Sequence, residues 1–284
     1  VLIDYPDFNW RLAKKAKKLG IPVFSYIPPS AWAWRKGRAK ACTKLADEFV
    51  AIFPHELPVY KAAGAKISFV GNPLVDAVRP ELPRVRARSY FHIPADKTAV
   101  LLLPGSRKQE IKDNLPDMLK AASAFPDYQL VLAGAPGIAP EYYKQYVGQA
   151  KVKIIFAQTY RLLQHAEAAL VTSGTATLET ALFRVPQVVC YYTPIGKVVS
   201  FLRRHILKVK FISLVNLIAD REVVKELVAD TMTVGNMQNE LKKLIEDQEY
   251  KNRMLAEYEY MADRLGPAGA PQHAARKMLE LLKK

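Results

Sequence analysis

Cysteine is scarce in this chain, and long apolar runs are missing. Only two of the 284 residues are cysteines, Cys42 and Cys190, and their separation matches no metal-binding spacing. Both lie in apolar stretches, which is typical of small buried side chains in a reducing compartment. No apolar run approaches the roughly 20 residues that a membrane-spanning helix needs. The sequence therefore predicts neither a disulfide framework nor a transmembrane segment.

Acidic residues are also few, since 27 Asp and Glu stand against 42 Lys and Arg, a net charge of +15. Such a charge predicts an anionic partner. Residues 10–44 and 180–219 contain no acidic residue, and the second stretch holds the basic amphipathic segment Gly196–Lys210. This segment suits the surface of an anionic membrane, although a solvated helix with its apolar side in the core is the alternative. No groove-reading or base-stacking motif accompanies the charge, so we expect no nucleic-acid partner.

Short apolar runs alternate with longer helical patterns, which predicts an α/β fold with repeated βα units and parallel sheets. The expected strands are residues 1–4, 23–27, 48–53 and 66–70, followed by 99–103, 129–133, 152–156, 169–172 and 187–191.

A break in this rhythm, rich in proline and charge, predicts two lobes. The expected parts are a first lobe over residues 1–76, a linker over 77–97, a second lobe over 98–264, and a C-terminal helix within 265–284 that could cross back to the first lobe. Because the first strand candidate opens the chain without a Met, we also expect the first lobe to be incomplete at its N-terminus.

The strongest local signal follows the strand at 99–103, where Pro104, Gly105, Ser106 and Arg107 precede a helical pattern. Backbone N–H groups and the helix dipole favour a phosphate at such a junction, and Arg107 can add a bidentate charge. An ordinary tight turn with Ser106 as the helix cap explains these four residues equally well.

A second loop of the same kind favours the phosphate site. Ser173, Gly174 and Thr175 also follow a strand and precede a helix, where they could hold a diphosphate. Glu179, one turn later, could accept hydrogen bonds from ribose hydroxyls, with a capping role as the alternative. Because no Asp-x-Asp triplet occurs in the chain, we expect no metal site, and a metal-independent mechanism is favoured.

The first lobe offers a candidate base and two aromatic side chains. Asp7 follows the first strand and opens a helix, where a carboxylate could take a proton from an acceptor hydroxyl, although it could equally cap the helix. Trp32 and Trp34 lie near a loop-to-helix transition and could line a sugar pocket or simply belong to the core.

Together these motifs resemble the lipid-A-disaccharide synthase family. The motifs that carry the resemblance span nearly the whole chain and occur in the family's order: Asp4-x-Pro6-Asp7-Phe8-Asn9, Pro29-Ser30-x-Trp32-Ala33-Trp34-Arg35, Phe53-Pro54-x-Glu56, Val70-Gly71-x-Pro73-Leu74, Leu103-Pro104-Gly105-Ser106-Arg107-x-x-Glu110-Ile111, Ser173-Gly174-Thr175-Ala176-Thr177-Leu178-Glu179, Ser213-Leu214-x-Asn216-Leu217 and Glu226-Leu227. The resemblance implies a GT-B fold of two Rossmann-like lobes, with the acceptor in the first, and an inverting, metal-independent transfer.

The implied reaction moves 2,3-diacylglucosamine from UDP-2,3-diacylglucosamine to 2,3-diacylglucosamine 1-phosphate, giving lipid A disaccharide 1-phosphate and UDP. The UDP-sugar is the donor substrate, and no cofactor is expected. The family works on the cytoplasmic face of the anionic inner membrane, as a peripheral protein, and a homodimer is left open.

Carried over residue by residue, the resemblance implies that Arg107 and Asn216 are needed for activity. It also implies that Ser173, Gly174, Thr175 and Glu179 form the UDP site, with Gly105 and Ser106 in the partner loop and Asp7 as the candidate base. Two other functions stay open on the residues alone: an isomerase similar to UDP-N-acetylglucosamine 2-epimerase on the same fold, and a non-enzymatic binder of nucleic acid or anionic lipid.

Overall fold

The structure is a computed structural model that describes residues 1–30, 36–78, 91–94, 97–192 and 210–283. Contacts divide the chain into two compact units. The first contains the described residues of Val1–Ala77 and Met261–Lys284, and the second those of Val78–Ile206 and Lys210–Tyr260. Trp32, Trp34 and nearly all of the basic segment Gly196–Lys210 lie outside the described residues.

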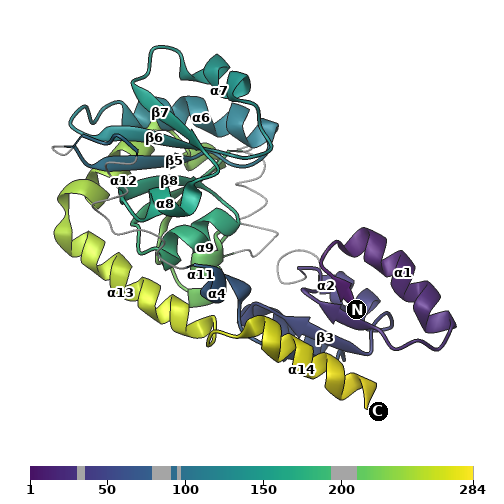
Figure 1. The fold of residues 1–284 in the computed structure, drawn as a ribbon. Helices are drawn as coiled ribbons and strands as arrows, with labels where there is room; N and C mark the ends of the chain where they lie inside the picture. The colour runs from purple at the N-terminus through teal and green to yellow at the C-terminus, as the bar shows by residue number, and fades with distance from the viewer. Residues whose placement is uncertain (31–35, 79–90, 95–96, 193–209, 284) are drawn as a thin grey trace. The chain divides into compact units, whose positions relative to one another are not determined.

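The first unit is built on a four-stranded sheet in the order β1-β2-β3-β4, with every neighbouring pair parallel (Figure 1). Its elements are β1 (Leu2–Ile3), α1 (Pro6–Lys18), β2 (Phe24–Tyr26), α2 (Lys36–Cys42), β3 (Glu48–Ala51), the 3-10 helix η1 (Pro54–Glu56), α3 (Leu57–Ala62), β4 (Ile67–Phe69), α4 (Pro73–Ala77) and α14 (Ala270–Leu282).

Helix α14 belongs to this unit through both polar and apolar contacts. Asp76 accepts hydrogen bonds from the backbone N–H groups of Gly269 and Ala270, at 2.8 and 3.2 Å, at the start of the helix. Ala274 packs with Phe24 and Val50 in a buried apolar cluster. A carboxylate at a helix N-terminus satisfies amides that have no partner within the helix.

The second unit carries a six-stranded parallel sheet in the order β10-β9-β8-β5-β6-β7 (Figure 1). Its elements are β5 (Ala99–Leu103), α6 (Lys108–Ala122), β6 (Gln129–Gly134), α7 (Pro140–Val147), β7 (Val152–Phe156), α8 (Thr159–Leu163), β8 (Ala166–Thr172), α9 (Thr175–Leu182), β9 (Gln187–Tyr191), α11 (Leu214–Ala219), β10 (Lys225–Val228), the 3-10 helix η3 (Ala229–Thr231), α12 (Val234–Glu246) and α13 (Gln248–Arg264), within which the boundary between the units falls.

The core of the second unit explains why its strands were visible in the sequence. All five residues of β5 are buried, as expected for a strand covered on both faces of a parallel sheet. Leu101 and Leu103 pack with Val131, and also with Phe91 and Ile93, which the sequence placed in the linker. The expected α/β class with parallel sheets is confirmed.

Strand β10 was not predicted from the sequence. It is a four-residue edge strand, Lys225–Val228, that pairs only with β9 in the described sheet. Its first two residues, Lys225 and Glu226, are charged and only half-buried. An edge strand lacks the continuous apolar run that reveals a central strand, so its pattern was hidden.

The order of the strands fixes where a ligand could bind in this unit. From β5 the chain proceeds outward through β6 to β7, and it then returns to the other side of β5 as β8, followed by β9 and β10. The order therefore reverses between β5 and β8. Open α/β sheets bind ligands outside the carboxyl ends of the strands at such a switch point.

Candidate functional site

A cavity of about 380 Å³ lies at the carboxyl ends of β5 and β8, where the strand order reverses. It is lined by seven residues that the sequence singled out: Gly105, Ser106, Arg107, Ser173, Gly174, Thr175 and Glu179. The loop after β6, Gly134 to Pro136, also lines it. Two loops separated by almost 70 residues of sequence thus meet in one cavity because their parent strands are neighbours in the sheet.

The loop after β5 is held by a carboxylate of its own helix. Oε2 of Glu110 accepts hydrogen bonds from the backbone N–H groups of Ser106 and Arg107, at 3.0 and 3.2 Å, and Oε1 accepts one from Nη1 of Arg107 at 2.6 Å. Glu110 is the third residue of α6, the position from which a Glu side chain caps a helix start. The amides expected to bind phosphate are therefore occupied by Glu110, a difference from the sequence expectation.

Gly105 is needed for this arrangement. Its φ of +115° lies in the region that favours glycine, and a Cβ atom here would stand 2.6 Å from both Cβ and Oε2 of Glu110. Arg107 keeps 80% of its side chain exposed, and the guanidinium has further N–H groups besides the one that Glu110 accepts. The side chain of Arg107 remains able to bind a phosphate that enters the cavity.

The loop after β8 is not held by a carboxylate of its own helix, because no acidic residue lies in the first turn of α9. The third residue of this helix is Thr177, whose hydroxyl turns back to the carbonyl oxygen of Gly174 at 2.8 Å. Gly174 has a φ of +149°, and a Cβ added there would meet open space. The first amides of a helix lack partners within it and carry its positive dipole end, so this terminus can bind an anion.

Asn216 does not line the cavity, because its side chain is completely buried. Its Nδ2 donates to the carbonyl of Val224 and to Oε1 of Glu226, at 2.9 and 3.0 Å. Its Oδ1 accepts from the N–H groups of Val223 and Val224, at 2.7 and 3.0 Å. With both ends of the amide engaged inside the protein, Asn216 supports the surrounding chain rather than touching a ligand.

The support given by Asn216 reaches the cavity through further hydrogen bonds. Glu226 accepts from the backbone N–H groups of Ile212 and Ser213, the nearest at 2.9 Å. The carbonyl of Ile212 in turn accepts from Oγ of Ser173 at 3.1 Å. Ser173 therefore donates a hydrogen bond to the carbonyl of Ile212, and a chain of hydrogen bonds that begins at Asn216 positions it.

Asn114, which the sequence did not single out, ties the neighbouring loops together. It is buried on α6, and its Nδ2 donates to the carbonyl of Pro104 and to Oγ1 of Thr172, at 3.3 and 3.1 Å. Its Oδ1 accepts from the N–H of Tyr192 at 3.3 Å. One amide thus fixes the ends of β5, β8 and β9, and only its position on the apolar face of the helix, beside Ile111 and Leu115, could have revealed it.

In the first unit, Asp7 lies exposed in the first turn of α1. The two residues before this helix, Asp4 and Tyr5, have φ values of +48° and +42°, and the side-chain amide of Asn9 donates to the carbonyls of Ile3 and Asp4. Left-handed backbone costs about 1–2 kcal/mol per non-glycine residue and concentrates at functional sites. The turn beside Asp7 therefore carries strain of the kind found in active sites.

The other notable carboxyl of this unit is Glu56, which is 2% exposed. Burial raises the pKa of Glu56 to about 8, so the side chain is mostly protonated at neutral pH. Burial and the charge of Arg264 lower the pKa of the neighbouring His55 to about 4. Neither group suits a base at neutral pH: Glu56 keeps its proton, and His55 is too weak a base to take one.

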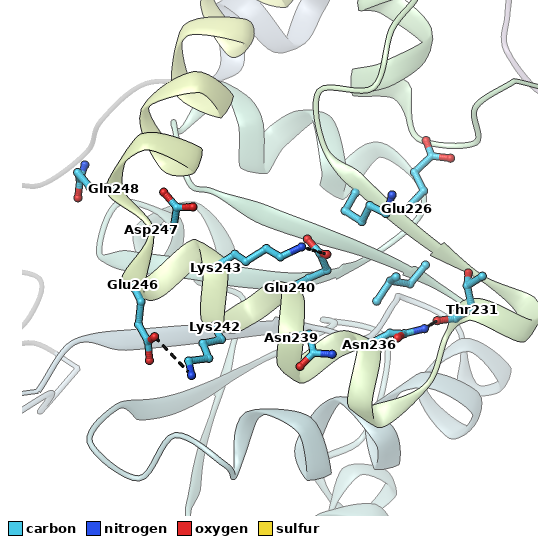
Figure 2. Close-up of a pocket in the computed structure, with 12 residues that line it drawn as sticks. Glu226, Thr231, Asn236, Asn239, Glu240, Lys242, Lys243, Glu246, Asp247 and Gln248 are labelled. Carbon is cyan, nitrogen blue, oxygen red and sulfur yellow. Dashed lines mark hydrogen bonds and ion pairs between the residues drawn. The ribbon is translucent and has the colours of Figure 1, made fainter.

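A larger cavity of about 960 Å³ lies between β10 and α12, but four of its charged side chains bind one another in two pairs (Figure 2). Lys243 pairs with Glu240 at 2.7 Å, and Lys242 with Glu246 at 3.7 Å. The carboxylate of Glu226 points away from these pairs, toward Ile212. Its described lining includes no arginine and no glycine-containing loop before a helix, so this cavity is a weaker candidate than the one at the switch point.

Within the described ranges, no group of three or more His, Cys, Asp and Glu side chains could hold a metal ion. No helix in the described part of the chain is both long and apolar enough to cross a bilayer.

Solved structures share this fold at low sequence identity. The co-structure of S. aureus MnaA with UDP superposes with a TM-score of 0.69 at 14% identity, covering 100% of this chain and 76% of that one. Arabidopsis thaliana UGT89C1 complexed with UDP-L-rhamnose gives a TM-score of 0.57 at 16% identity, covering 96% and 70%. The fold is therefore that of the GT-B class, two units with parallel sheets, as expected.

The sequence narrows this class to one family. The family model described as lipid-A-disaccharide synthetase matches residues 1–277. The lipid-A-disaccharide synthases of Syntrophus aciditrophicus and Geobacter sulfurreducens are 39% and 34% identical, each over 100% of this chain and over 76% and 75% of their own lengths. The chain belongs to the lipid-A-disaccharide synthase family, which is a family of glycosyltransferases. The UDP-GlcNAc 2-epimerase from Neisseria meningitidis, with a TM-score of 0.65 at 14% identity over 97% of this chain and 73% of that one, is similar in fold alone.

Proposed function

We propose that this protein binds a UDP-sugar at the switch point between β5 and β8 and transfers the sugar to an acylated acceptor. The donor is UDP-2,3-diacylglucosamine and the acceptor 2,3-diacylglucosamine 1-phosphate, giving lipid A disaccharide 1-phosphate and UDP. The observation that carries the proposal is the cavity itself, where an open helix N-terminus and an exposed arginine face the same space. Membership of the synthase family supports the choice of substrates.

In this proposal the diphosphate binds mainly at the start of α9. The backbone N–H groups of Gly174 and Thr175 donate to the phosphate oxygens, and Arg107 approaches from the loop after β5. Glu179 accepts hydrogen bonds from the ribose hydroxyls. The negative charge that develops on the departing UDP is met by the dipole of α9 and by Arg107, so the step needs no metal ion.

Asp7 is the proposed general base. It takes the proton of the acceptor hydroxyl while that oxygen attacks the anomeric carbon of the donor, and UDP leaves from the opposite face. This single displacement inverts the anomeric configuration. The strained turn at Asp4 and Tyr5 supports the assignment, because such strain persists where a side chain must be held in one position.

We also propose that the protein acts as a peripheral protein on the cytoplasmic surface of the inner membrane. Helix α1 presents Phe8 and Leu12, 58% and 46% exposed, one helical turn apart. Exposed basic residues share this helix, namely Arg11, Lys14, Lys15, Lys17 and Lys18. An apolar stripe beside basic side chains suits an anionic bilayer surface, where the acylated substrates reside.

The transfer is tested by measuring UDP release from donor and acceptor without added metal. We expect release by the native protein and a loss of about 100-fold in Arg107→Ala, which corresponds to about 2.7 kcal/mol of transition-state stabilisation. Arg184→Ala is the matched control, because Arg184 is also an exposed arginine with a carboxylate partner, Glu259, but lies outside the cavity. Native protein that releases no UDP, or near-native transfer by Arg107→Ala, would contradict the proposal.

Sedimentation with vesicles that contain anionic lipid tests the membrane surface. Phe8→Ser with Leu12→Ser should weaken binding at low salt, whereas Leu279→Ser on α14, with the same exposure as Phe8, should not. Equal binding by all three proteins would exclude α1 as the contact.

A further inference from the structure

Tyr160 stands between the core of the second unit and the candidate site. It lies in α8, and its hydroxyl donates a hydrogen bond to Oε1 of Glu179 at 2.9 Å. Its ring packs against the apolar core and against Phe183, with 5.2 Å between the ring centroids. No role for Tyr160 was expected from the sequence, because it stands outside both glycine-containing loops.

In this contact Tyr160 is the hydrogen-bond donor and Glu179 is the acceptor. Burial and the neighbouring Glu179 raise the pKa of Tyr160 well above its ordinary value, so the phenol stays protonated and donates. A carboxylate accepts at both oxygens. Since Oε1 is engaged by Tyr160, the other oxygen, Oε2, is left for a ligand in the cavity that Glu179 lines.

We propose that Tyr160 is a positioning residue for ribose recognition, which fixes the Glu179 carboxylate in the orientation that accepts from the ribose hydroxyls. The inference rests on the proposed binding of a UDP-sugar in this cavity. A Glu side chain on a helix surface otherwise samples many rotamers, and that freedom must be lost when it binds a ligand. The phenol, itself held by Phe183 and the core, imposes this order before the ligand arrives.

Tyr160→Phe removes only the hydroxyl and keeps the ring against Phe183. Titration calorimetry should then show UDP binding weakened about five- to tenfold, a loss within the range of one ordinary hydrogen bond. The analogue 2′,3′-dideoxy-UDP lacks the hydroxyls that Glu179 would bind. The affinity of Tyr160→Phe for this analogue should differ less than about twofold from that of the native protein, because the phosphate and uracil contacts remain.

Two further variants separate a positioning role from a general structural one. Tyr250→Phe is the matched control, since Tyr250 also donates to a glutamate, Glu240 at 3.2 Å, but away from this cavity. It should leave the affinity for both ligands unchanged. Glu179→Ala should bind UDP and the dideoxy analogue about equally, and adding Tyr160→Phe to it should weaken UDP no further.

The affinities for the two ligands decide between these roles. An equal loss of affinity for both ligands in Tyr160→Phe would show a merely structural role and overturn the inference. An unchanged affinity for UDP would overturn it as well. Native protein that binds UDP but does not prefer it to the dideoxy analogue would overturn the role of Tyr160 while leaving the nucleotide site intact. Native protein that does not bind UDP would overturn the proposed function and this inference with it.

Discussion

The two helix N-termini at the switch point look alike in sequence and differ in chemistry. Each follows a buried strand and a short loop with glycine and serine, yet the third helical residue is Glu110 in α6 and Thr177 in α9. Glu110 turns back and occupies the amides of its own loop, whereas no side chain of the described residues caps the start of α9. A phosphate-type loop therefore binds phosphate only if no side chain of its own takes the amides first.

The two loops are also supported in different ways. The loop after β5 is held from within, by Glu110, while the loop after β8 is held from a distance. There, Asn216 and Glu226 fix the backbone of Ile212, whose carbonyl accepts from Ser173. Support from a distance leaves the amides of the second loop free to bind a ligand.

The largest expected effect comes from breaking this distant support. Asn216→Asp places a second carboxylate against Glu226 and removes the donor to the carbonyl of Val224. Burial of an uncompensated charge should lower the free energy of unfolding by about 4 kcal/mol, measured by chemical denaturation.

The double variant Asn216→Asp with Glu226→Gln again pairs one carboxylate with one amide, but the two groups have exchanged positions. It should recover about half of the lost stability, because the amide introduced at position 226 could donate to the carboxylate introduced at position 216. The oxygen of the same amide could still accept from the N–H groups of Ile212 and Ser213. A double variant no more stable than Asn216→Asp would show that the two side chains are not coupled.

The next effect sharpens the contrast between the glycines of the two loops. Gly105→Ala brings a Cβ atom to 2.6 Å from Glu110 in a strained backbone, and it should cost about 3 kcal/mol of unfolding free energy. Gly174→Ala meets open space and should cost about 1 kcal/mol, all of it from its positive φ. Urea denaturation of both variants gives the comparison, and equal costs would mean that Glu110 does not lie tightly against the first loop.

The smallest expected effect concerns Glu110 itself. Glu110→Gln keeps an acceptor for the amides of Ser106 and Arg107 but loses the exposed ion pair, which should cost at most about 1 kcal/mol of stability. UDP affinity, measured by calorimetry, should change less than about threefold, because the diphosphate lies at α9 in this account. A loss above about tenfold would place the diphosphate at α6 instead.

Much of the second unit could be predicted from the sequence. Strands such as β5 are buried on both faces and appear in the sequence as continuous apolar runs. The two loops with glycine predicted the position of the cavity. The first strands are shorter than predicted, since β1 holds two residues and β4 three. Strand β10 was not predicted, because this edge strand contains Lys225 and Glu226 and has no continuous apolar run.

The roles of single side chains were harder to predict. That Asn216 is needed for activity stays a prediction, and its buried hydrogen bond to Glu226 could be found only in the structure. The capping by Glu110 and the contact of Tyr160 with Glu179 depend on side-chain directions that periodicity does not encode. Direct ligand contacts by Asp7, Arg107 and the residues of the second loop stay predictions.

One pair of substitutions decides whether the diphosphate binds at α9 or at α6. Proline is well tolerated at the first helical position and removes that residue's backbone N–H. Thr175→Pro and Lys108→Pro remove the equivalent amide from α9 and α6, and Thr175→Ala controls for the lost hydroxyl. UDP affinity by titration calorimetry should fall about tenfold or more in Thr175→Pro and less than about threefold in Lys108→Pro. A loss in Lys108→Pro as large as that in Thr175→Pro would contradict the account.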